Sequence, residues 1–156
     1  KERGELRDAV YCIAGKGPEL DRLRALAGDE AGDSILFLGY VSEGQKKTLL
    51  TRSDGFLHPN YSRDDTDFEG FGISLVEAAW FGCAVLGGKQ GGVPEAIGPL
   101  PGCELADTEH DDHAVEQIRQ FVESRPSRSR SMPDQSEVRR LIQNRLDLLI
   151  QFRNCL

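Results

Sequence analysis

The chain has 156 residues, of which 38% are hydrophobic and 29% charged, and its formal net charge is −7. This length suffices for one domain of ordinary size, while no apolar run approaches the length of a membrane span and no signal peptide is visible. The acidic balance argues against nucleic acid as a partner, because phosphate backbones are bound by an excess of Lys and Arg.

Short apolar runs alternate with longer helical patterns along the chain. The runs are partly β-branched or aromatic and end in Gly, Pro or a polar residue, which is typical of buried parallel strands. The expected strands are residues 10–14, 35–38, 55–58, 84–86 and 103–105. The expected helices are residues 19–27, 43–53, 72–81, 112–124 and 136–152. This alternation predicts an open α/β sheet, whose ligands bind outside the carboxyl ends of the strands.

The most informative segment is residues 69–82, with the sequence EGFGISLVEAAWFG. A helix is expected to begin near Gly72, because apolar residues recur after it at the spacing of an amphipathic helix: Ile73, Val76, Ala79 and Trp80. The first turn of such a helix exposes unpaired N–H groups, and Gly72 has no side chain to keep a phosphate away. Glu77, about a turn and a half further on, can reach a polyol such as ribose. Two glutamates eight residues apart are nevertheless common by chance.

Four segments together resemble the retaining nucleotide-sugar glycosyltransferases of the GT-B architecture. The glutamate pair with its internal Phe-Gly is similar to the signature of that family. The other three segments are IAGKGPE from Ile13, ILFLGYV from Ile35, and AVL from Ala84 followed by GGVPE from Gly91. They occur in the order and at the spacings of the family, from about residue 10 to residue 97, and the resemblance fades beyond that.

The resemblance implies an α/β, Rossmann-like open parallel sheet with helices on both faces, the C-terminal half of a GT-B fold. We expect residues 1–124 to form the donor-binding domain, truncated at its N-terminus, and residues 125–156 to be a linker and a C-terminal helix. The acceptor-binding domain is then a missing partner. Segment 125–131 is rich in Pro, Ser and Arg and is expected to be a surface loop.

The resemblance also implies roles for single residues toward a nucleoside diphosphate sugar. The base would lie against Tyr40 and Val41, and the ribose would bind Glu77. The diphosphate would bind the amides of Phe71, Gly72 and Ile73. Gly15 would allow close backbone approach, although a glycine turn after a strand is as often only a turn. Glu69 would be catalytic, facing the sugar and stabilising positive charge at its anomeric carbon.

No cofactor and no metal are expected, because family members of this type generally work without a divalent cation. His110 and His113 are three residues apart and have carboxylates close by, which superficially resembles a metal cluster. Asp and Thr before an apolar helix are ordinary N-capping residues, however, and we interpret this segment as a helix start.

The four cysteines, Cys12, Cys83, Cys103 and Cys155, show no zinc-binding spacing. Cys12 and Cys83 lie in or beside apolar strands, which indicates buried reduced thiols and a cytoplasmic location. Peripheral membrane contact by the last helix is an alternative to packing on protein.

Two other functions stay open at this point. One is a sugar-nucleotide epimerase of the same fold, and the other is a non-catalytic nucleotide-binding or partner-binding subunit.

Overall fold

The computed structural model of the protein describes residues 9–61 and 72–124. Within it the chain divides into two compact units, Lys1–Thr48 and Leu49–Leu156. The expected C-terminal helix at 136–152 and the linker at 125–131 lie outside the described residues. Each unit is described by itself below.

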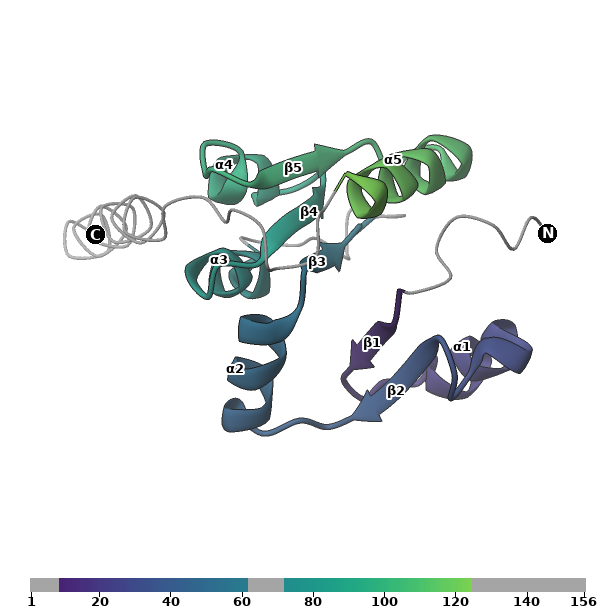
Figure 1. Ribbon diagram of the computed structural model, residues 1–156. Coiled ribbons are helices and arrows are strands. Elements are labelled where there is room, and N and C mark those ends of the chain that lie inside the picture. The colour runs from purple at the N-terminus through teal and green to yellow at the C-terminus, as the bar shows by residue number, and fades with distance from the viewer. Residues whose placement is uncertain (1–8, 62–71, 125–156) are drawn as a thin grey trace. The chain divides into compact units, whose positions relative to one another are not determined.

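Unit 1 consists of two parallel strands and the helices between them. Strand β1 (Tyr11–Ala14) pairs with β2 (Ile35–Gly39), and Tyr11 lies opposite Ile35. Between them lie α1 (Leu20–Ala27) and the short 3-10 helix η1 (Gly28–Glu30) (Figure 1). The Arg24 guanidinium lies 5.7 Å from the centre of the Phe37 ring and so joins α1 to β2.

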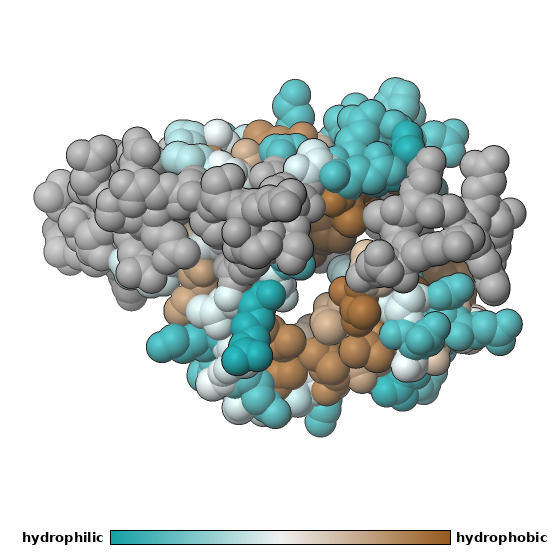
Figure 2. All heavy atoms as spheres, in the orientation of Figure 1, coloured by the Kyte–Doolittle hydropathy of each residue, from teal (hydrophilic) through white to brown (hydrophobic). Residues whose placement is uncertain are grey.

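The prediction that all strands are buried is wrong for β1. Val10 is 58% exposed and Tyr11 44%, and Cys12 is exposed rather than buried. Among the described residues β1 pairs with β2 alone, and α1 has no buried residue, so little covers the strand. Figure 2 shows hydrophobic residues as brown spheres where Figure 1 draws β1 and β2.

Unit 2 contains a three-stranded parallel sheet in the order β3-β4-β5. Its strands are β3 (Gly55–His58), β4 (Ala84–Gly88) and β5 (Cys103–Ala106). Its helices are α3 (Ile73–Trp80), α4 (Val93–Ile97) and α5 (Asp111–Glu123). Helix α2 (Glu43–Arg52) contains the boundary between the two units. Five predicted strands and four predicted helices are thus confirmed to within about two residues, and α4 stands where a turn was expected.

Helices cover both faces of the unit 2 sheet, as predicted. Val85 packs with Leu75 of α3 and Ile97 of α4 in one core cluster. Its neighbour Leu86 packs with Phe121 of α5 in a second cluster. Because successive side chains of a strand point to opposite faces, α3 and α4 lie on one face and α5 on the other. All five residues of β4 are buried between them.

Helix α5 begins differently from the prediction. Its N-cap residue is His110, whose side chain makes no capping hydrogen bond. The Thr108 hydroxyl donates to the carbonyl of Asn60 instead, and Asp107 accepts the N–H of Glu109. The expected N-capping by Asp and Thr is therefore wrong for Asp107 and Thr108, because tertiary contacts and a local turn use their oxygens.

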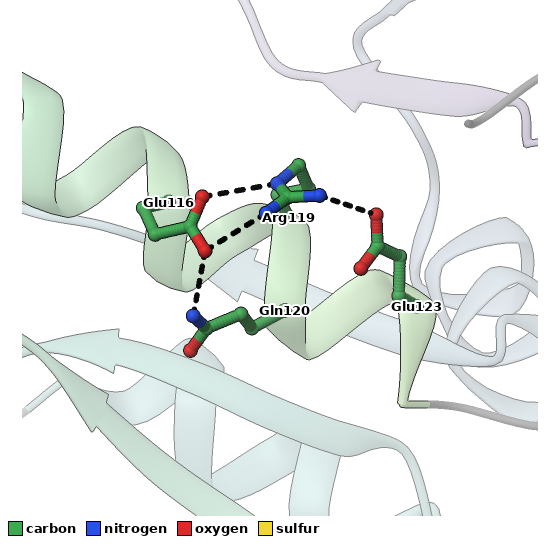
Figure 3. A network of polar contacts seen from close by, with 4 residues as sticks. All are labelled: Glu116, Arg119, Gln120 and Glu123. Atoms are coloured by element: carbon green, nitrogen blue, oxygen red, sulfur yellow. Dashed lines mark hydrogen bonds and ion pairs between the residues drawn. The ribbon is translucent and has the colours of Figure 1, made fainter. Parts of the chain in front are cut away.

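The outer surface of α5 carries a network of polar side chains (Figure 3). Arg119 donates to both carboxylate oxygens of Glu116, at 3.0 and 2.9 Å, and to Glu123 at 3.2 Å. The Gln120 amide donates to Glu116 at 2.6 Å. The hydrogen bonds from Arg119, and then that from Gln120, lower the pKa of the Glu116 carboxyl below its ordinary value.

Among the helices in residues 9–61 and 72–124, none combines the length and the apolar character that crossing a bilayer requires.

Candidate functional site

Helix α3 begins at a glycine that no other residue could replace without strain. Gly72 has φ 65° and ψ 50°, the left-handed conformation, and it is buried. Its carbonyl accepts the N–H groups of Leu75 at 2.9 Å and Val76 at 3.3 Å. A Cβ at Gly72 would lie 2.7 Å from Cδ1 of Leu75 and 3.3 Å from Cγ2 of Val93. Both backbone conformation and packing therefore fix the start of the helix.

The face of α3 that meets the core agrees with the predicted stripe except at Ile73. Ala79 is buried and Val76 and Trp80 pack against the core, with Leu75 and Ala78 buried beside them, whereas Ile73 is 68% exposed. Ile73 is predicted to lie on the apolar stripe, but it is the first residue of the helix and its side chain faces solvent. It stands four residues before Glu77, which is half-buried. Side chains four residues apart share one face of a helix, so Ile73 and Glu77 lie on the same side of α3.

The first turn of α3 has N–H groups for which the described residues offer no acceptor. The N–H groups of Leu75 and Val76 donate to the carbonyl of Gly72. The N–H groups of Ile73 and Ser74 form no hydrogen bond with a described residue. Unpaired N–H groups at the positive end of the helix dipole attract anions. A side chain on a helix tilts toward the N-terminus, so the Glu77 carboxylate leans toward this turn.

The carboxyl ends of β3, β4 and β5 are tied together by Asn60. Its Oδ1 accepts the N–H of Gly88 at 3.1 Å, and its carbonyl accepts the hydroxyl of buried Thr108 at 2.8 Å. A Cβ at Gly88 would lie 2.2 Å from the Asn60 carbonyl oxygen, so only glycine permits this approach. Asn60 Nδ2 is buried and has no partner in the described part of the chain.

The sequence placed Asn60 in a turn at the ligand-binding edge of the sheet but did not indicate that it ties strand ends together. Asn directly after Pro59 at the end of a strand is the signal that could have suggested a bridging turn.

Gly87 brings α3 and α4 against the end of β4. A Cβ there would lie 2.7 Å from Cγ1 of Val93 and 2.9 Å from Cδ1 of Ile97. Val93 also contacts the position of Gly72, so the starts of α3 and α4 meet at the carboxyl edge of the sheet. The GGVPE segment therefore supports the start of α3 from a neighbouring element.

Unit 1 brings the other predicted binding residues to one end of its strands. Gly15, with φ 145°, follows β1 and donates its N–H to the carbonyl of Gly39 at 2.7 Å. Gly39 has φ 64° and precedes Tyr40, which is 75% exposed, and half-buried Val41. The three residues Gly15, Tyr40 and Val41 thus lie at the carboxyl ends of β1 and β2.

A capping box that sequence reasoning missed follows these residues. The Ser42 N–H donates to Oε1 of Gln45 at 2.8 Å, and the Gln45 N–H donates to Oγ of Ser42 at 3.3 Å. The Ser-x-x-Gln spacing was the available signal, and it fixes the direction in which the chain leaves Val41.

The predicted site residues therefore fall into two described groups. Gly72, Ile73 and Glu77 lie together on α3 in unit 2, and Gly15, Tyr40 and Val41 lie together in unit 1. Glu69 and Phe71 lie outside the described residues.

Residues 1–136 match the model of a protein family described as glycosyl transferases group 1. The chain is 35% identical over 97 residues to the GDP-mannose-dependent alpha-(1-6)-phosphatidylinositol monomannoside mannosyltransferase of Mycobacterium tuberculosis, covering 61% of this chain and 25% of that protein. It is 36% identical over 107 residues to the phosphatidylinositol N-acetylglucosaminyltransferase gpi3 subunit of Schizosaccharomyces pombe, covering 67% of this chain and 22% of that protein. The chain thus spans about a quarter of the length of these curated relatives.

A solved structure has a similar fold. It is AviGT4, a glycosyltransferase involved in avilamycin A biosynthesis, with a TM-score of 0.63 and 18% identity over 92% of this chain and 42% of that one. This likeness concerns the fold, and it confirms the Rossmann-like α/β architecture. The family assignment rests on the match over residues 1–136, and it confirms the resemblance seen in the sequence: the chain belongs to the glycosyl transferases group 1 family.

Proposed function

We propose that this chain is the donor-binding part of a retaining glycosyltransferase, which moves a sugar from a nucleoside diphosphate sugar to an acceptor. The observation that carries the proposal is the start of α3 at the carboxyl edge of the unit 2 sheet. There a buried left-handed glycine precedes two N–H groups without an acceptor among the described residues, and Glu77 shares the face of Ile73. Family membership supplies the class of ligand.

The diphosphate of the donor binds at the first turn of α3 in this proposal. The N–H groups of Ile73 and Ser74 donate to phosphate oxygens, together with the amides of Phe71 and Gly72 that the family resemblance assigns to the diphosphate, and the helix dipole adds positive potential. Positive potential of this kind is local, so the net charge of −7 does not oppose it. The same groups stabilise the diphosphate when its bond to the anomeric carbon breaks, because charge on the leaving oxygen then grows.

Glu77 binds the ribose hydroxyls. Its carboxylate lies on the face of α3 above Ile73, one to two turns from the phosphate site, which matches the separation of ribose and diphosphate within one nucleotide. A charged hydrogen bond of this kind contributes about 1.5–3 kcal/mol.

The base lies against Tyr40 and Val41, with Gly15 allowing the backbone to approach. Tyr40 is exposed, and apart from its chain neighbours no described residue lies within 4 Å of a Cβ at Gly15; both observations support room for a ligand beside the ends of β1 and β2. This part of the proposal rests on observations in unit 1 alone, separate from those at the start of α3.

Glu69 faces the sugar and acts in the transition state. As an anion it stabilises the positive charge that develops at the anomeric carbon while the donor bond breaks and the acceptor oxygen approaches. We further propose that the donor site requires no metal ion, and that transfer requires an acceptor-binding part beyond this chain.

Relatives guide the choice of donors to test. The name of the M. tuberculosis relative states dependence on GDP-mannose, and the name of the S. pombe relative states N-acetylglucosaminyl transfer. Because backbone contacts leave little trace of base identity, we extend the proposal only to the class of nucleoside diphosphate sugars.

We also propose a reducing, cytoplasmic location. Cys83 is buried and its thiol donates to the carbonyl of Ser53 at 3.4 Å, and the described cysteines Cys12, Cys83 and Cys103 form no disulfide with one another. Free thiols of this kind are ordinary in reducing compartments.

The test is an NMR titration of the chain with GDP, UDP, ADP and GDP-mannose. Binding through one helix terminus and Glu77 alone predicts dissociation constants near millimolar, roughly 4 kcal/mol of binding. The amides of Gly72, Ile73 and Glu77 should shift in the wild-type chain and stay unshifted in Glu77→Ala at the same nucleotide concentration; in the complete enzyme Glu77→Ala should weaken nucleotide binding about 10- to 150-fold. Glu69→Gln should leave nucleotide affinity nearly unchanged, because the part of the donor that reacts is absent from a free nucleotide.

Glu123→Ala is the matched control, since it removes a surface glutamate from α5 and should not affect binding. Shifts that gather around His110 and His113 while α3 stays silent would place the nucleotide elsewhere. An unchanged affinity of Glu77→Ala would refute the ribose role, and a loss confined to Glu69→Gln would reverse the two assignments.

A further inference from the structure

Two imidazoles and a carboxylate converge where β5 ends and α5 begins. Asp107 follows the last residue of β5, His110 is the N-cap residue of α5, and His113 lies in its first turn. Each can offer one ligand atom, and these atoms all lie within 4.8 Å of one another. The two imidazole ring centres are 5.4 Å apart. The three side chains therefore reach one common point.

The carboxylate of the group is held in place by neighbours. The Asp107 N–H donates to Oε1 of Gln117 at 2.7 Å, which attaches its backbone to the second turn of α5. Asp107 Oδ1 accepts the N–H of Glu109 at 3.1 Å, which orients the carboxylate. Outer contacts of this kind orient metal ligands and support their affinity.

The loop between the carboxylate and the imidazoles is also anchored. The buried hydroxyl of Thr108 donates to the carbonyl of Asn60 at 2.8 Å, and the carbonyl of His110 accepts the N–H of Ala114 at 3.0 Å. The backbone of all three groups is thus fixed from both sides, and only the exposed imidazoles must turn to close on an ion.

We propose that Asp107, His110 and His113 bind Zn²⁺. Two nitrogen ligands and one oxygen ligand suit this ion, whereas Mg²⁺ and Ca²⁺ prefer oxygen ligands alone. Zinc–ligand bonds of about 2.0–2.2 Å place tetrahedral ligand atoms roughly 3.3 Å apart, so the side chains must close by less than about 1.5 Å. The fourth position would hold water. Asp111 and Asp112 in the first turn add negative charge that offsets the positive end of the helix dipole.

This site uses no residue of the proposed donor site, and its success or failure is independent of the proposed function. The ion would join the loop after β5 to the first turn of α5. Spacing alone had favoured an ordinary helix start here, because it could not show that Asp107 lies beside both imidazoles.

The test is calorimetric titration of the whole chain with zinc chloride, together with NMR of the imidazole resonances. We expect one site on the wild-type protein and shifts of the His110 and His113 rings. Loss of a contact outside the ligand shell lowers metal affinity roughly 10- to 100-fold. Removal of a ligand itself by His110→Ala, His113→Ala or Asp107→Asn should lower zinc affinity by at least that factor. The His110 side chain makes no capping hydrogen bond, so its removal does not weaken the start of α5.

Two control variants separate this site from other zinc ligands. Glu123→Gln removes a carboxylate at the far end of α5, and Cys12→Ser removes an exposed thiol; both should bind zinc within about twofold of wild type. His113→Gln, with an unchanged circular dichroism spectrum, guards against a loss caused by unfolding. Retained binding in the double variant His110→Ala/His113→Ala, loss of binding in Cys12→Ser, or no uptake by the wild-type protein at millimolar zinc would each overturn the proposal.

Discussion

Units 1 and 2 repeat the same order of strand, glycine and helix, but they differ in how much of it they bury. Helix α1 of unit 1 has no buried residue, whereas α3 of unit 2 buries Leu75, Ala78 and Ala79. Strand β1 is mostly exposed, whereas every residue of β4 is buried. Strand β4 has a strand on each side and helices on both faces, so its neighbours decide its burial.

The glycines at the two candidate sites sharpen this comparison. Gly39 has φ 64° and Gly72 has φ 65°, so their backbones share the left-handed conformation. A Cβ at Gly39 would meet nothing within 4 Å, while one at Gly72 would press into Leu75 and Val93. The two glycines thus have the same backbone conformation, but Gly39 has open space beside it and Gly72 lies in a packed core.

The largest expected difference is between two truncations, each of one leucine on a helix of one unit. Leu75→Ala in unit 2 should lower the free energy of unfolding by about 2–5 kcal/mol, because Leu75 is fully buried. Leu26→Ala in unit 1 should change it by less than about 0.5 kcal/mol, because Leu26 is 76% exposed.

Denaturant unfolding measures both changes, with circular dichroism for the whole chain. The fluorescence of Trp80, the single tryptophan and part of α3, reports on unit 2. Similar losses for the two variants would contradict the difference in burial on which the comparison rests.

The next effect, which at most equals that of Leu75→Ala, is expected from substituting the paired glycines. Gly39→Ala and Gly72→Ala should each cost about 1–2 kcal/mol of unfolding free energy for the left-handed backbone. Gly72→Ala should cost roughly 1–3 kcal/mol more, because its methyl group would lie 2.7 Å from Leu75 Cδ1.

The double variant Gly72→Ala/Leu75→Ala tests the cause of the extra cost. Removing the Leu75 side chain relieves the contact, so the double variant should be more stable than the sum of the single losses predicts. Additive losses would show that the added methyl group and Leu75 do not interact.

The smallest expected effect concerns the surface pairs on α5 and α1. The hydrogen bonds from Arg119 and Gln120 hold the pKa of Glu116 below its ordinary value of 4.5. A lowered folded-state pKa stabilises the protein above the unfolded-state pKa, and this contribution disappears as the pH falls through the folded-state value.

Glu116→Gln should therefore be slightly less stable than wild type at neutral pH and equally stable in strong acid. Glu19→Gln is the matching change in unit 1, where Glu19 pairs with Arg22 among residues 9–61 and 72–124. Urea unfolding at a series of pH values measures both, and added salt should reduce the small difference because these side chains are exposed. If the loss of unfolding free energy in Glu116→Gln grew below pH 4.5, it would contradict a lowered pKa of Glu116 in the folded protein.

Much of the fold and part of the site could be predicted from the sequence. The bounds of β3 were predicted as observed, and the other strands to within two residues, because side-chain periodicity and strand-ending glycines are local signals. The start of α3 at Gly72 was predicted for the same reason. Its left-handed glycine and the turn of backbone N–H groups after it belong to one short segment.

Other features depend on residues that lie far apart in the chain. Exposure of β1 and Cys12 reflects how few of the described residues cover unit 1, which periodicity within the strand cannot report. Asn60 meets Gly88 and Thr108 across 28 and 48 residues, and Asp107 meets His113 only once β5 and α5 have taken their places. Local sequence therefore determined the helices and strands and the start of α3 at Gly72. Only the tertiary structure decided burial, the hydrogen bonds that tie the strand ends together and the imidazole cluster, because these depend on contacts between distant segments.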